Sequence, residues 1–110
     1  MTSAGWPGAG YHDYAVGYVI GIAWYREEDY ERIMTLMADG ASFPKTHASW
    51  RQKAVRMERE LKRQGLRPVR VEVDPVAFER WCIEQGTLPD SQARNRFVEH
   101  GLARQPVKNR

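Results

Sequence analysis

The sequence predicts one small α+β domain in the order strand, helix, helix, strand, helix, helix. Its 110 residues are enough for one hydrophobic core and too few for two domains. Apolar residues make up 42% and charged residues 28% of the chain, which is typical of a globular protein. Two short segments have the apolar pattern of strands, and four others repeat apolar residues at helical spacing.

The two predicted strands are residues 15–25 and 68–73. In the first, large side chains fall on one face, which we expect to lie in the core; they are Tyr18, Ile20, Ile22 and Trp24. The second alternates valine with charged residues, as a half-exposed strand does. Because two strands make a marginal sheet, we expect either the preceding residues or a second copy of the chain to add a strand at an exposed edge.

The four predicted helices are residues 27–38, 46–64, 75–85 and 90–100. Each has an apolar stripe, and the third begins with an Asp-Pro pair typical of a helix N-terminus. We expect Gly101 to end the last helix. The aromatic residues on three of the stripes should share one core; they are Trp50, Phe78, Trp81 and Phe97.

The ends of the chain lack apolar periodicity. We therefore predict a flexible leader over residues 1–14, a domain over 15–101 and a flexible basic tail over 102–110. The longest apolar stretch has eleven residues, whereas a membrane-spanning helix needs about twenty. With no readable secretory signal and a single cysteine, Cys82, we expect a cytoplasmic protein that does not associate with membranes.

Positive charge is concentrated in the middle of the chain, where residues 45–70 carry nine basic and two acidic side chains. Such a surplus is typical of a surface that binds a nucleic acid or an acidic protein. It is also typical of any solvated helix. The candidate contacts in and before the second helix are Lys45, Arg51, Lys53, Arg56, Arg59 and Arg63.

The last two predicted helices, joined by a short turn at Gly86, have the outline of a helix-turn-helix. Side chains early in the final helix are of types that contact base edges or phosphates; they are Gln92, Arg94, Asn95 and Arg96. A plain helical hairpin with no nucleic-acid role has the same outline. The sequence leaves both interpretations open.

Residues that could support catalysis are few. His47 lies near the start of the second helix, where backbone N–H groups could bind an anion. The alternative is that Thr46 or Ser49 caps that helix and His47 faces water. Cys82 lies on an apolar stripe, which predicts a buried, unreactive thiol. The three histidines are too far apart in sequence to indicate a metal site, so no metal, cofactor or catalytic residue is predicted.

These observations favour a non-enzymatic binding module that contacts a nucleic acid or an acidic partner through residues 46–64, through the hairpin of 75–85 and 90–100, or through both. One alternative is a protein-interaction module or homodimer that uses the aromatic strand over residues 18–25. A second alternative is an enzyme that uses His47.

Overall fold

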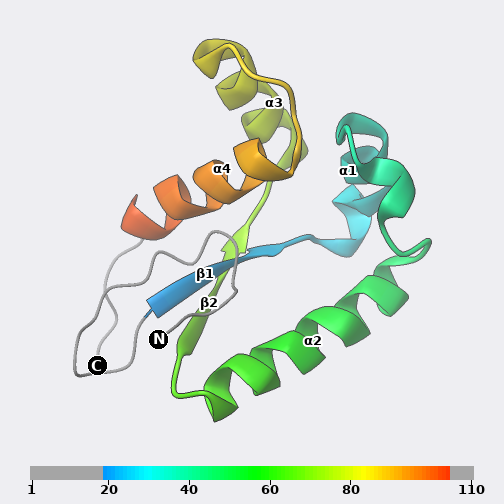
Figure 1. Ribbon diagram of the computed structural model, residues 1–110. Coiled ribbons are helices and arrows are strands. Elements are labelled where there is room, and N and C mark those ends of the chain that lie inside the picture. The colour runs from blue at the N-terminus through cyan, green and yellow to red at the C-terminus, as the bar shows by residue number, and fades with distance from the viewer. Residues whose placement is uncertain (1–18, 105–110) are drawn as a thin grey trace.

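The computed structural model describes residues 19–104 (Figure 1). Its strands and helices are β1 (Val19–Trp24), α1 (Tyr30–Leu36), α2 (His47–Arg63), β2 (Arg67–Glu72), α3 (Pro75–Gln85) and α4 (Ser91–Arg104). Short 3-10 turns at Glu27–Asp29 and Gly40–Ser42 flank α1. The predicted α+β class and element order are confirmed. The predictions for residues 1–14 and for the tail beyond Arg104 lie outside the described residues.

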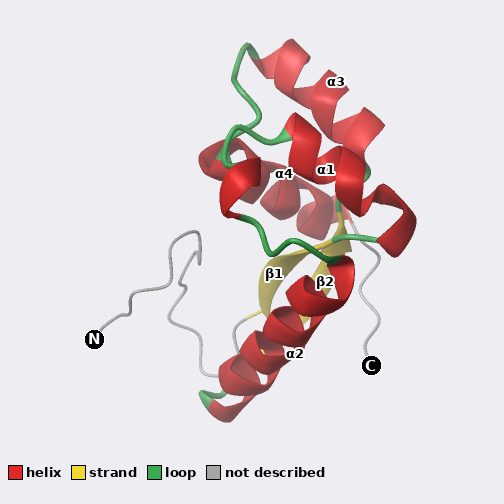
Figure 2. Cartoon of the chain, turned by 90° about the vertical axis from the view of Figure 1, so that its right-hand side faces the viewer, coloured by secondary structure: helices red, strands yellow, loops and turns green. Residues whose placement is uncertain are grey.

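The two strands form a parallel sheet in which Val19 lies opposite Arg67 and Trp24 lies opposite Glu72. They can be parallel because the intervening segment, with α1 and α2, returns the chain to the starting end of the sheet. Figures 1 and 2 show α2 on one side of the sheet and α4 on the other. Within residues 19–104, no helix has the length and apolar composition needed to cross a bilayer.

Both faces of β1 are covered, whereas the sequence predicted only one buried face. Trp24 faces α2, where its ring lies 4.9 Å from that of Trp50. Ile22, on the same face, is buried as predicted. The opposite face, with Gly21 and Ala23, lies against α4 and the main core. The expectation of a single core face was therefore incomplete, because a helix that follows later in the chain covers the small residues.

The helix α4 does not end at Gly101 as predicted, but continues to Arg104, so that residues 102–104, predicted to begin the tail, belong to the helix. A β-carbon at Gly101 would lie only 2.8 Å from Cγ1 of Val71, and one at Gly21 would lie 2.9 Å from Cγ1 of Val98. Both distances are shorter than those that real Cβ atoms make with neighbouring atoms. Gly101 therefore provides close contact between helix and sheet, which the sequence alone does not distinguish from a helix terminator.

The first helix is shorter than predicted, because the backbone leaves the helix at Met37 and becomes extended. This turn directs Met37 into the core, where it is buried. The next N–H, of Ala38, donates to the carbonyl of Pro89 at 2.8 Å and ties the segment to the loop before α4. Tertiary contacts therefore end this helix.

The predicted helix caps are present. The Thr46 side chain accepts a hydrogen bond from the N–H of Ser49 at 3.0 Å, and Asp74 accepts one from Ala77 at 2.8 Å. Gly86 ends α3 in the left-handed conformation with φ of 69°, which glycine adopts without strain. These local interactions set where α2 and α3 begin and where α3 ends.

The core is centred on Phe78, which is fully buried. Phe97 meets it edge to face with ring centroids 5.1 Å apart, and Trp81 lies against both rings. Trp50, from α2, packs against another part of the same buried core, where its ring centroid lies 4.9 Å from that of Tyr25. The prediction that these four aromatic residues share one core is confirmed.

Replacing Phe78 by alanine should lower the free energy of unfolding by about 3–5 kcal/mol, because it leaves a cavity that the neighbouring rings cannot fill. Ile83 lies on the same helix but is 74% exposed. Ile83→Ala should therefore change stability by less than about 0.5 kcal/mol. Urea denaturation of both variants checks this, and equal losses would contradict the assigned core.

Gly101→Ala should destabilise the protein by about 1 kcal/mol, although alanine is the better helix former. The new methyl group must displace the stiff, buried side chain of Val71, and such overpacking costs about 1–3 kcal/mol. Thermal unfolding of Gly101→Ala with and without Val71→Ala provides the test. A methyl group that costs as much in the Val71→Ala background as in the wild type would contradict this contact.

Candidate functional site

The predicted basic residues around α2 are all exposed. The helix buries Ala54 and Leu61, and four basic residues recur at three- and four-residue spacing along its outward side. We call these four the α2 basic face; they are Lys53, Arg56, Arg59 and Arg63. Lys45 precedes the helix, whereas Arg51 lies nearer the sheet, with its guanidinium 5.7 Å from the ring centroid of Trp24.

Both acidic side chains of α2 form ion pairs with arginines. Arg70 of β2 binds Glu58 through two hydrogen bonds of 2.7 and 2.8 Å and also stacks over Trp24. Glu60 pairs with Arg63 and accepts a hydrogen bond from Gln64. The hydrogen bond from Arg70 lowers the pKa of Glu58, so this carboxylate stays ionised and paired.

Within residues 19–104, by contrast, no carboxylate lies within ion-pair distance of Lys53, Arg56 or Arg59. Since the two acidic groups of α2 are already paired, the charge of these three side chains is not neutralised by the helix that carries them. Three of the four side chains of the α2 basic face, all but Arg63, therefore present unpaired positive charge to solvent.

The structure places Arg94 inside the molecule. Its guanidinium donates two hydrogen bonds of 3.1 Å to the two carboxylate oxygens of Asp39, and it lies 5.2 Å from the ring centroid of Phe43. The Arg94 side chain is only 15% exposed. Arg94 thus joins α4 to the segment after α1, and this position differs from the surface contact expected from the sequence.

The other predicted residues of α4 are exposed, but they do not join the α2 basic face. Arg96 stacks over Trp81 at 5.8 Å, Gln92 faces solvent, and Asn95 lies near the edge of β1. Because α4 and α2 lie on opposite sides of the sheet, a straight nucleic acid cannot contact both outward surfaces at once. The structure does not bring the two predicted groups together.

His47 is half-buried and does not face water, contrary to the capping hypothesis in which it does. Its Nε2–H donates to the backbone carbonyl of Tyr25 at 2.7 Å, and its ring packs against Tyr30 and Trp50. The expected Thr46 cap is nevertheless present. His47 therefore holds the start of α2 against the end of β1.

Cys82 and the metal-ligating types of side chain are the remaining candidates for chemistry among the described residues. Cys82 is buried, and burial raises the pKa of its thiol, so it is a poor nucleophile at neutral pH. Among the described residues, no three His, Cys, Asp or Glu side chains come close enough to hold a metal ion.

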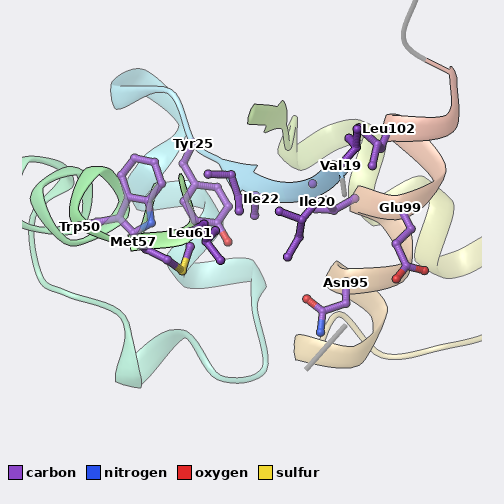
Figure 3. Close-up of a pocket in the computed structure, with 13 residues that line it drawn as sticks. Val19, Ile20, Ile22, Tyr25, Trp50, Met57, Leu61, Asn95, Glu99 and Leu102 are labelled. Carbon is purple, nitrogen blue, oxygen red and sulfur yellow. The ribbon is translucent and has the colours of Figure 1, made fainter. Parts of the chain in front are cut away.

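A groove of about 640 Å³ runs along the outer edge of β1, between α2 and α4 (Figure 3). Trp50, Met57 and Leu61 line it from α2, and Asn95, Val98, Glu99 and Leu102 line it from α4. The sequence did not reveal this groove, because Met57 fits the apolar stripe of its helix. Only the structure shows that this side chain is 36% exposed.

The ion pair between Asp39 and Arg94 should make stability depend on pH. The hydrogen bond from Arg94 lowers the pKa of Asp39 in the folded protein. The stabilisation is therefore complete above the unfolded-state pKa of about 3.9 and is lost as pH falls through the lower folded value. Asp39→Asn should cost about 1–2 kcal/mol at neutral pH, because one member of the pair is partly exposed.

Denaturant titrations of the wild type and Asp39→Asn between about pH 2 and 7 test this expectation. The difference in stability should narrow as the pH falls below about 4. Glu84→Gln, on the exposed side of α3, serves as the control and should show little difference at any pH. A gap for Asp39→Asn that is constant across the range would contradict an ionic contribution.

Comparisons with protein-family models, with curated proteins and with solved structures find no match to this chain. A function must therefore be inferred from the chemistry and geometry of the chain's own residues. In the described part of the molecule, the features that stand out are the α2 basic face and the groove beside β1.

Proposed function

We propose that this protein is a non-enzymatic binding module that contacts the phosphate backbone of a nucleic acid through the α2 basic face. The observation that carries the proposal is the unpaired charge of Lys53, Arg56 and Arg59, set beside two glutamates already bound by arginine. The helix carries six basic and two acidic side chains, so it retains a net positive charge. We also propose that the protein is located in the cytoplasm, as expected from the sequence.

Phosphate contacts suit this surface better than base recognition does. Arginine and lysine on one helix face can follow a line of phosphates and release the counterions that surround them, whereas sequence recognition needs side chains that enter a groove. The face consists of long cationic side chains. Binding should therefore be strongly salt-dependent and show little sequence preference.

An acidic protein would be attracted by the same cations. A nucleic acid is the better fit, because its regularly spaced phosphates match charges that repeat along one helix face. An acidic protein becomes the preferred partner if nucleic acids do not bind at low salt.

Arg56→Gln/Arg59→Gln should weaken binding similarly for all sequences of a labelled DNA duplex. If each side chain contacts one phosphate, the slope of log K against log salt concentration becomes shallower by about 1.8, or about 0.9 per contact. Fluorescence anisotropy between about 50 and 200 mM salt measures this slope. Arg32→Gln/Arg80→Gln removes two exposed arginines from α1 and α3 and should have a much smaller effect.

Equal losses in both double variants would show that net charge alone matters and would overturn the assigned face. The pair Gln92→Ala/Asn95→Ala tests the alternative surface on α4. These substitutions should leave affinity and salt slope unchanged; a loss of sequence preference would instead move the interface to α4. No binding of the wild type to DNA or RNA at low salt would refute the proposal.

A further inference from the structure

The outer edge of β1 has backbone groups directed away from the sheet. The N–H of Val73 donates to the carbonyl of Trp24 at 2.9 Å, so the backbone polar groups of Trp24 point toward β2. Inward and outward groups alternate along a strand. Those of Val19, Gly21 and Ala23 therefore point outward, and no other strand within residues 19–104 pairs with this edge.

Within residues 19–25, this edge carries none of the sequence features that usually protect exposed strands. Residues 19–25 contain no charged side chain and no proline, whereas natural edge strands commonly carry lysine, proline or a bulge. Val19 is 48% exposed at one end of the groove. At the other end, the outward carbonyl of Tyr25 is already bound by His47, which limits the available edge to β1 itself.

We propose that the edge of β1 pairs with β1 of a second copy of this chain, so that two protomers form one four-stranded sheet. A two-fold axis perpendicular to the sheet at Gly21 makes the two strands antiparallel. It places Gly21 opposite its own copy and Val19 opposite Ala23 of the partner subunit. All of these residues direct their backbone N–H and C=O groups outward. In this register, these groups form hydrogen bonds between the two copies of β1, and the pairing of β1 with β2 is unchanged.

The same symmetry preserves the two faces of the sheet. Residues that face each other across an antiparallel pair lie on the same side, so the small residues of both copies remain beneath α4. The large residues, Ile20 and Ile22, remain on the side of α2. Uncharged strands would thus meet along a groove lined mainly by apolar side chains, with Asn95 and Glu99 as its polar lining residues.

The helices also leave room for this arrangement. α4 packs across both β1 and β2, so the two copies of α4 would lie about two strand spacings apart. With strands about 4.8 Å apart this separation is about 10 Å, which is close to the 8–10 Å at which helices pack. The two copies of α4 would therefore contact each other without overlapping.

The size of the groove sets the expected strength of the dimer. Thirteen residues of each protomer line it, compared with about 20–30 per side in an interface of standard size. We therefore expect a dissociation constant on the order of micromolar or weaker. The dimer would place both α2 basic faces on the same side of the sheet, but its formation does not depend on nucleic-acid binding.

Sedimentation equilibrium of the full chain over about 1–500 μM, without nucleic acid, should show a reversible monomer–dimer equilibrium. Val19→Lys places a charge on the edge and should weaken the dimer at least about tenfold. Val76→Lys is a matched control, because Val76 is a valine of α3 with 47% exposure, close to the 48% of Val19. It should leave the equilibrium unchanged.

Far-ultraviolet circular dichroism and thermal unfolding confirm that both lysine variants are folded. Arg56→Gln/Arg59→Gln should dimerise like the wild type, so failure of the nucleic-acid proposal is distinguishable from failure of this one. A monomer at every concentration would overturn the proposal, as would equal weakening by the two lysine substitutions. A monomer at every concentration is also the result expected if residues 1–18 of the same chain occupy the edge of β1.

Discussion

A sheet of two parallel strands cannot bury its own surfaces, and here its faces are covered by helices from different parts of the chain. α2, which precedes β2 in the sequence, covers one face, and α4, the last helix of the described residues, covers the other (Figure 1). The close approach of α4 depends on Gly21 and Gly101, since a methyl group at either would collide with a valine. This contact aligns Phe97 with Phe78 and directs Arg94 toward Asp39.

The structure divides the charged residues of the chain into two groups with different consequences. Arg70 and Arg94 bind carboxylates from other elements and fasten helices to their neighbours. Lys53, Arg56 and Arg59 have no such contact within residues 19–104 and point away from the sheet. Sequence charge counts treat all of these residues alike, whereas only unpaired cations on one surface can attract an extended polyanion.

The unpaired edge of β1 within residues 19–104 follows from the same architecture. With α2 and α4 on its two faces, a two-stranded sheet hides its side chains but still leaves backbone donors and acceptors at each edge. His47 satisfies the outward carbonyl of Tyr25 at the end of β1. The preceding outward backbone groups lie in a groove with mainly apolar walls, and no strand within residues 19–104 pairs with them.

The sequence by itself determined the element order, the caps at Thr46 and Asp74, and the aromatic core, because these depend on local hydrogen bonds and on apolar spacing. It also located the basic segment from which the candidate site is built. Only the tertiary structure decided that Gly101 lies within a helix and that Met57 lines a groove. Each of these outcomes is set by atoms distant in the sequence, which no local pattern contains.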